Sequence, residues 1–172
     1  MSDEKDSEKL PEGTLISHLL ELRDRFFRIA VSVAIVFAPS VYFRNEIFNF
    51  LAEPMIHSGA KLITTTVVSP FATPLKVAFY FSLFVAMPYI LSQVWGFVSP
   101  GLYKKEKRFA IPLLVSSIAL FYIGVAFAYF LVFPKVFPFF LHTTPSAVEN
   151  MTDINSYLDF ALTLFLGFGI AF

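Results

Sequence analysis

Residues 77–98 read VAFYFSLFVAMPYILSQVWGFV, and these 22 residues contain no charged side chain. As an α-helix the segment would be about 33 Å long, because each helical residue adds about 1.5 Å. The hydrocarbon core of a bilayer is about 30 Å thick, so a helix of this length can cross it. The stretch therefore predicts a membrane-spanning helix.

The composition of the whole chain agrees with that prediction. The chain has 172 residues, of which 56% are hydrophobic, 15% are charged and 23 are phenylalanine. Soluble domains carry about 25% charged residues, so the composition excludes an ordinary soluble domain. We therefore predict an all-α polytopic integral membrane protein. The sequence contains no cysteine, which excludes disulfides, thiolate metal sites and cysteine nucleophiles.

Three further apolar runs extend the prediction. Residues 109–133 are also free of charge, and Pro134 follows them directly. Residues 29–43 form a shorter apolar run. Phe26 and Phe27 extend it only if the Arg28 side chain reaches the membrane surface with its charge. Asp153 is a good N-cap for the last run. The expected spans are about 26–43, 75–98, 109–133 and an incomplete 154–172.

The segments outside the spans have predicted structures of their own. Residues 1–13 are acidic and are expected to form a disordered tail, with 14–172 as a single transmembrane domain. Thr14 is the expected N-cap of an amphipathic helix that joins the first span. In this helix the spacing predicts i,i+4 ion pairs between Glu21 and Arg25 and between Asp24 and Arg28.

The connection between the first two spans also contains helix signals. Asn45 is expected to cap a short interfacial helix, and Pro54 is expected to end it. The next span can begin at Ser69-Pro70 or at Thr73-Pro74, because proline suits the first helical turn.

The last run is too short to cross a bilayer. Its apolar part, 160–172, would rise only about 20 Å. A chain that stopped inside hydrocarbon would leave backbone carbonyls without partners. We therefore expect the sequence to be part of a longer protein. A re-entrant segment is the alternative.

Basic residues predict the orientation. Lys and Arg are concentrated on the cytoplasmic side of membrane proteins. The N-terminal segment and loop 99–108 are basic, whereas 44–76 and 134–153 contain few such residues. The first two segments are therefore expected in the cytoplasm and the other two on the opposite side.

The sequence contains none of the common catalytic motifs. It has no metalloprotease, nucleophile-elbow or glycine-rich phosphate pattern. We therefore expect no enzyme activity and no cofactor or metal. Nucleic-acid binding is not expected either, because no basic face exists outside one short loop.

Two cytoplasmic carboxylates are the candidate binding groups. Glu21 and Glu106 are predicted on the same membrane face, where they could receive two guanidinium groups from a ligand. Arginine suits such a site because its planar fork binds a carboxylate with two hydrogen bonds. The alternative is that Glu21 pairs with Arg25 and Glu106 with its basic neighbours. Gln93 either bonds within the helix bundle or lines a polar concavity.

Four stretches carry a family resemblance. They read SHLLELRDR from Ser17, SPFATPLK from Ser69, QVWGFVSPGLYKKEKR from Gln93 and FYIGVAFAYFLVFP from Phe121. Together they are similar to the C subunit of the twin-arginine protein translocase, the TatC family. The resemblance implies six transmembrane helices with both termini in the cytoplasm. It also implies a glutamate directly after Phe172, where this sequence stops.

The resemblance also implies a function. It predicts a receptor in the bacterial inner membrane for twin-arginine signal peptides of folded cargo, whose export is driven by the proton gradient. Expected partners are single-span A and B subunits, further copies of the chain, and the lipid bilayer. Glu21 and Glu106 match the acids that recognise the arginine pair. The supporting positions implied are Leu19, Arg23, Phe97, Pro100 and Tyr103, with Gln93 nearby and Pro54 in the first outer loop.

Two other functions stay open on the residues alone. A small-solute secondary transporter would carry ionisable groups at mid-membrane, and the two long spans have none. A purely structural subunit of a membrane assembly is the other alternative.

Overall fold

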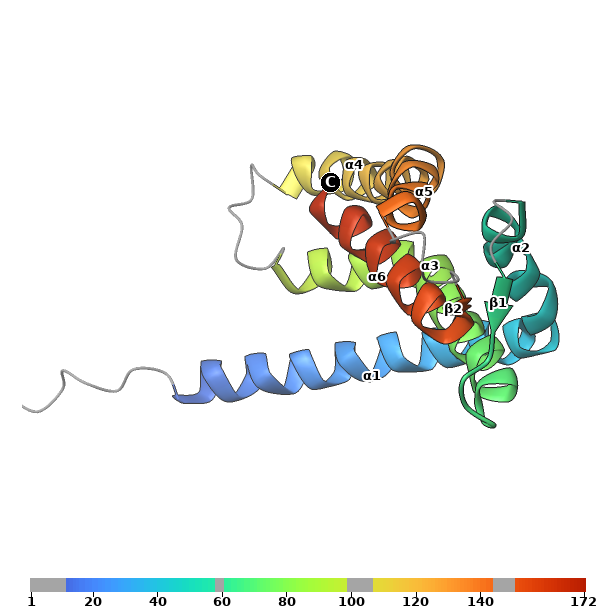
Figure 1. The fold of residues 1–172 in the computed structure, drawn as a ribbon. Helices are drawn as coiled ribbons and strands as arrows, with labels where there is room; N and C mark the ends of the chain where they lie inside the picture. The colour runs from blue at the N-terminus through green and yellow to red at the C-terminus, as the bar shows by residue number, and fades with distance from the viewer. Residues whose placement is uncertain (1–11, 58–60, 99–106, 144–150) are drawn as a thin grey trace, which may run out of the picture.

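A computed structural model describes residues 12–57, 61–98, 107–143 and 151–172. It consists of helices joined to one small sheet (Figure 1). In chain order the elements are α1 (Glu12–Tyr42), α2 (Arg44–His57), β1 (Lys61–Ile63), α3 (Ser69–Val98), α4 (Lys107–Phe127), the π-helix η2 (Ala128–Val132), α5 (Phe133–Thr143), β2 (Met151–Asp153) and α6 (Ile154–Ala171).

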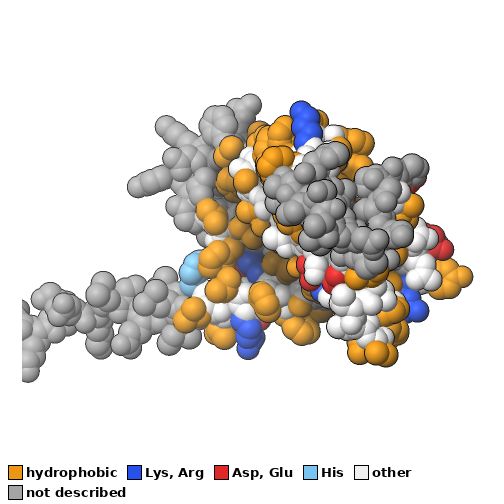
Figure 2. Space-filling view, viewed as in Figure 1, with side chains coloured by type: hydrophobic (Ala, Val, Ile, Leu, Met, Phe, Trp, Pro, Cys, Tyr) orange, Lys and Arg blue, Asp and Glu red, His pale blue; other side chains and the backbone are white. Residues whose placement is uncertain are grey.

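The described residues include four helical segments that are long and apolar enough to cross a membrane. This confirms the four predicted runs, and the segments are Ser17–Tyr42, Ser69–Val98, Ala110–Val136 and Ile154–Ala171. Large hydrophobic side chains cover much of the visible surface of these helices (Figure 2). Lipid would cover such a surface favourably, whereas water would not.

The first helix differs from its predicted start. Helix α1 begins at Glu12, inside the segment expected to be a disordered tail and two residues before the expected cap at Thr14. It then continues without interruption through Pro39 to Tyr42. One helix of 31 residues therefore combines the amphipathic segment and the first span. Its length of about 46 Å exceeds the hydrocarbon thickness, so its charged turns can extend into the aqueous phase.

Prolines end helices less often than the sequence predicted. Helix α2 continues past Pro54 to His57, so the expectation that Pro54 ends it is wrong. A proline removes one backbone hydrogen bond, and the neighbouring bonds of the helix can persist. Helix α3 begins at Ser69, the first of the two predicted starts, and includes Pro74.

The third span also continues beyond Phe133, its expected last residue. The π-helix η2 precedes Pro134, and the Phe133 amide donates to the Ala128 carbonyl five residues earlier. In an ideal α-helix the proline ring would clash with the carbonyl four residues before it. The wider π turn relieves this clash, and α5 can follow.

A short parallel sheet joins the two segments predicted on the non-cytoplasmic side. Lys61 in β1 lies opposite Met151 in β2, and Ile63 lies opposite Asp153. The sequence did not predict these strands, which have only three residues each. Their pairing is consistent with the prediction that 44–76 and 134–153 lie on one side of the membrane.

The core lies where α6 packs against α3, α4 and η2. Leu158, Leu162 and Val77 are fully buried there. Gly124 allows α4 and α6 to approach closely, because a Cβ at this position would lie 2.5 Å from the Phe168 carbonyl oxygen. The core therefore fixes α6 against α3, and α3 contributes to the candidate site.

Candidate functional site: the contact between α1 and the end of α3

Glu21 and Arg25 form an ion pair on α1. The Nε and Nη2 atoms of Arg25 donate to the same carboxylate oxygen, Oε1 of Glu21, at 3.0 and 2.6 Å. The pair has i,i+4 spacing, which places the two side chains on one helix face. The sequence predicted this contact as the alternative to ligand binding.

Arg25 also reaches α3, which the sequence did not predict. Its Nη1 donates to the Gln93 carbonyl at 3.2 Å, and its Nη2 donates to the Gly96 carbonyl at 2.9 Å. Gly96 is among the last four residues of α3, whose carbonyls have no partner within the helix, so a cation is stabilising there. A Cβ at Gly96 would lie 2.5 Å from Nη1, so a larger residue there would require the Arg25 guanidinium to shift.

A ring contact holds the same two helices together. The His18 ring on α1 stacks on the Phe97 ring of α3, with centroids 4.2 Å apart. Phe97 was predicted as a supporting residue, and the structure brings it to the same α1–α3 contact as Glu21. His18 was not predicted as a site residue.

The other predicted residues of α1 are exposed. Leu19 has 64% of its surface accessible. Arg23 is also exposed and donates to Asp24 at 2.9 Å. The predicted Asp24–Arg28 pair is thus replaced by a pair between adjacent residues. Asp24 gains no contact with another helix from this arrangement.

Gln93 has a divided environment. Its carbonyl accepts from Arg25, whereas its side-chain Oε1 is buried and has no hydrogen-bond partner among the described residues. This oxygen makes no hydrogen bond within the described part of the bundle, and the choice between the two environments considered for the side chain stays a prediction.

Several predicted residues cannot be placed at this site. Glu106, Pro100 and Tyr103 lie outside the described residues. Pro54 belongs to α2, which follows the C-terminal end of α1, whereas Glu21 lies in the N-terminal half of that helix (Figure 1). The structure does not bring these two residues together.

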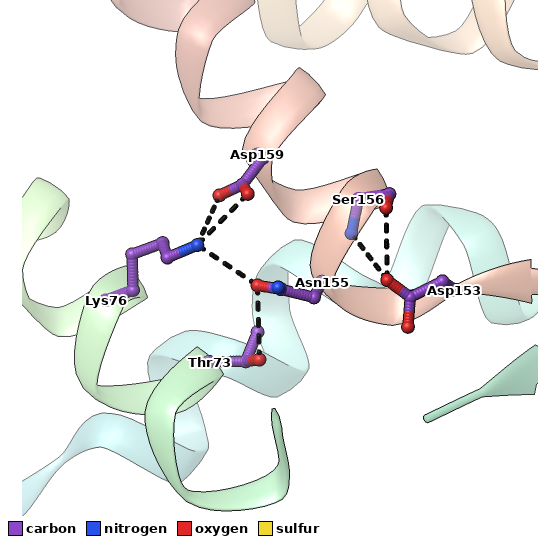
Figure 3. Close-up of polar contacts among 6 residues, drawn as sticks. All are labelled: Thr73, Lys76, Asp153, Asn155, Ser156 and Asp159. Atoms are coloured by element: carbon purple, nitrogen blue, oxygen red, sulfur yellow. Dashed lines mark hydrogen bonds and ion pairs between the residues drawn. The ribbon is translucent and has the colours of Figure 1, made fainter. Parts of the chain in front are cut away.

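A second polar cluster lies at the other end of α3 (Figure 3). Lys76 donates to both carboxylate oxygens of Asp159 on α6, at 2.8 and 3.0 Å. Lys76 also donates to the side-chain oxygen of Asn155 at 3.1 Å. The same Asn155 oxygen accepts a hydrogen bond from the Thr73 hydroxyl at 3.5 Å. This cluster ties the start of α3 to the start of α6.

Asp153 caps α6, as the sequence predicted. One of its oxygens accepts from the Ser156 amide at 3.1 Å, and the other accepts from the Thr65 hydroxyl at 3.0 Å. Hydrogen bonding favours the charged form, so the Ser156 amide lowers the pKa of the Asp153 carboxyl, with a smaller effect from Thr65. Among the described residues, no group of three His, Cys, Asp or Glu side chains could hold a metal ion.

Comparison with known proteins decides the family. The family model described as "Sec-independent protein translocase protein (TatC)" matches residues 17–172. The chain belongs to the TatC family. This finding confirms the resemblance seen in the sequence.

Individual TatC proteins are similar over most of the chain. The Sec-independent protein translocase protein TatC of Haemophilus influenzae is 51% identical over 161 residues, which cover 92% of this chain and 63% of the relative. The TatC of Escherichia coli K12 is 49% identical and is covered to 62%. This chain thus spans less than two thirds of the length of these curated relatives.

A solved structure has the same fold. The crystal structure titled "Twin Arginine Translocase Receptor- TatC" superimposes with a TM-score of 0.81 at 37% identity. The match covers 90% of this chain and 69% of the solved one. The arrangement of the four spans is therefore the TatC fold.

Proposed function

We propose that this chain contributes the signal-peptide receptor of a Sec-independent translocase, and that Glu21 binds an arginine of the twin-arginine motif. One observation carries the proposal. Arg25 uses only Oε1 of Glu21, and the structure gives Oε2 no hydrogen-bond partner among the described residues. The Glu21 side chain is 37% exposed, so a ligand can reach that oxygen.

The chemistry of the two partners fits this role. A guanidinium group presents several N–H donors in one plane, whereas an ammonium group is a compact point charge. An open carboxylate oxygen at an exposed helix face can accept a charge-assisted hydrogen bond from such a fork. Glu106 is proposed to bind the second arginine, as the family resemblance implies. Leu19, Arg23 and Phe97 would form the surrounding surface.

The cellular setting is part of the same proposal. The chain would lie in the bacterial cytoplasmic membrane with its N-terminus and loop 99–108 in the cytoplasm. It would act with single-span A and B subunits and further copies of itself, in a six-span protein. Transport would draw on the proton gradient, without an enzymatic step or a cofactor.

The proposal is tested by binding of two synthetic peptides to the purified protein in lipid nanodiscs. The peptides share one sequence and differ only in an Arg-Arg or a Lys-Lys pair. We expect the Arg-Arg peptide to bind more tightly, and Glu21→Ala and Glu106→Gln each to weaken its binding. A hydrogen bond to a charged group contributes about 1.5–3 kcal/mol, which corresponds to roughly 10- to 100-fold in affinity.

The matched control is Asp24→Asn, which removes an exposed carboxylate from the same helix. It should leave the affinity for the Arg-Arg peptide nearly unchanged. An equal loss in Asp24→Asn and Glu21→Ala would mean that general charge attraction, and no specific site, binds the peptide. Unchanged affinity in both Glu21→Ala and Glu106→Gln would refute the assignment of these acids.

A further inference from the structure

Arg25 poses a physical question at the proposed site. A permanently charged guanidinium group is bonded to the carboxylate that is proposed to receive another guanidinium group. Like charges repel, so simple electrostatics treats Arg25 as a competitor that weakens ligand binding. The contacts of Arg25 with α3 suggest a different role.

Arg25 makes four hydrogen bonds from three nitrogens to two helices. Two of them end on Glu21 Oε1, and the other two end on the carbonyls of Gln93 and Gly96. Gln93 and Gly96 are 68 and 71 residues away in the sequence, so these bonds fix α1 relative to α3. The Arg25 side chain is only 21% exposed, less than the 37% of Glu21.

These bonds also determine how Glu21 is presented. A free glutamate side chain rotates about three bonds, and ordering it on binding costs free energy. Arg25 holds one oxygen of the carboxylate at a fixed place beside the end of α3. The other oxygen then has a defined position and no described partner. The positive charge of Arg25 is partly balanced by the negative end of the α3 dipole.

We propose that Arg25 is a positioning residue: it fixes the Glu21 carboxylate against the carbonyls of Gln93 and Gly96, and so presents Oε2 to an incoming guanidinium. The proposal rests on the signal-peptide function proposed above. It makes Arg25 a determinant of the preference for Arg-Arg over Lys-Lys. A disordered carboxylate would attract both pairs by charge. A fixed single oxygen can accept two N–H groups of one planar guanidinium, as Oε1 does from Arg25, and the compact ammonium of lysine does not match that geometry.

The test measures both peptides on two variants in lipid nanodiscs. Arg25→Gln removes the charge, and Arg25→Lys keeps the charge but cannot span Glu21 and both carbonyls. We expect each variant to bind the Arg-Arg peptide about tenfold more weakly, the size expected for one misaligned charge-assisted hydrogen bond. The Lys-Lys affinity should change less, so the ratio of the two affinities should fall.

The matched control is Arg28→Gln, which removes an exposed cation from the same helix three residues away. Removing this charge should slightly strengthen binding of both cationic peptides and leave their ratio unchanged. In a Glu21→Gln background, Arg25→Lys should have no further effect on the ratio, because the carboxylate that it positions is absent.

Three results would overturn the proposal. Tighter Arg-Arg binding in Arg25→Gln would show that Arg25 competes with the ligand. An unchanged affinity ratio in both Arg25 variants, with binding still lost in Glu21→Ala, would reject positioning and keep the receptor function. An equal loss for both peptides in Arg25→Lys would indicate a structural role alone.

If the unmodified protein shows no Arg-Arg preference, the receptor function itself fails. Arg25→Lys carries the test alone if Arg25→Gln does not fold.

Discussion

Helix α3 is held near its two ends by Lys76 and by Arg25, and each of these cations forms an ion pair of different geometry. At its N-terminal end Lys76 bonds both carboxylate oxygens of Asp159 (Figure 3). Near its C-terminal end Arg25 bonds only one oxygen of Glu21 and uses its other donors on the helix carbonyls. Lys76 thus bonds both oxygens of its carboxylate, whereas one oxygen of Glu21 has no partner among the described residues.

This difference separates a contact between helices from a candidate binding site. Both carboxylates are partly exposed, so neither pair contributes much to stability through charge alone. What distinguishes them is the direction of the cation's remaining donors. Lys76 bonds a side chain of the same helix as its acid, whereas Arg25 bonds the backbone of a different helix. In the second arrangement one oxygen of the acid has no hydrogen-bond partner among the described residues.

The largest expected effect is a loss of peptide affinity on neutralising Glu21, compared with neutralising Asp159 in a separate variant. Glu21→Gln should reduce affinity for an Arg-Arg peptide by roughly 10- to 100-fold and leave the melting temperature nearly unchanged. Asp159→Asn should leave peptide affinity unchanged and lower the free energy of unfolding by about 1 kcal/mol or less. Peptide titrations and thermal melting of the same preparations would measure both effects. Similar binding losses in the two variants would remove the distinction between the two ends.

A second prediction compares the Lys76–Asp159 ion pair with the packing of α4 against α6. Gly124→Ala would place a Cβ 2.5 Å from the Phe168 carbonyl, a backbone atom that can shift only with the helix. Overpacking of this kind costs about 1–3 kcal/mol, more than an exposed ion pair contributes. Gly124→Ala should therefore lower the melting temperature more than Asp159→Asn. Gly167→Ala is the control, because a Cβ at Gly167 meets nothing within 4 Å.

The smallest expected effect on stability concerns Asp153, the N-cap of α6. The pKa of Asp153 is lowered in the folded protein, so the charged carboxylate stabilises the fold above the pKa of the unfolded chain. That stability is lost as the pH falls below about 4 and through the lowered pKa. Asn is also a good N-cap but does not titrate. Asp153→Asn should therefore show a smaller drop in melting temperature between neutral and acidic pH.

Asp153→Ala gives the contrast for that measurement, because it removes the cap at every pH. It should melt below both other proteins at neutral pH. If Asp153→Asn shows the same drop in melting temperature on acidification as the unmodified protein, other groups account for the acid dependence.

Much of the fold was predictable because its determinants are local. The apolar runs predicted the four spans, since a helix that enters the hydrocarbon of a bilayer must be predominantly apolar. Asp153 was predictable as a cap, and the Glu21–Arg25 pair followed from its i,i+4 spacing. The helix ends were less predictable. Helix α2 continues past Pro54, and the π-helix η2 precedes Pro134 and lets α5 follow.

The sequence by itself determined the class of protein, its spans, its family and the carboxylate of interest. Only the tertiary structure decided what surrounds that carboxylate. The bonds of Arg25 to Gln93 and Gly96, the pair of Lys76 with Asp159 and the strands β1 and β2 all join residues far apart in the chain. Hydropathy and helical spacing describe one segment at a time. Contacts between segments depend on how the helices pack, and that packing sets which oxygen of Glu21 stays open.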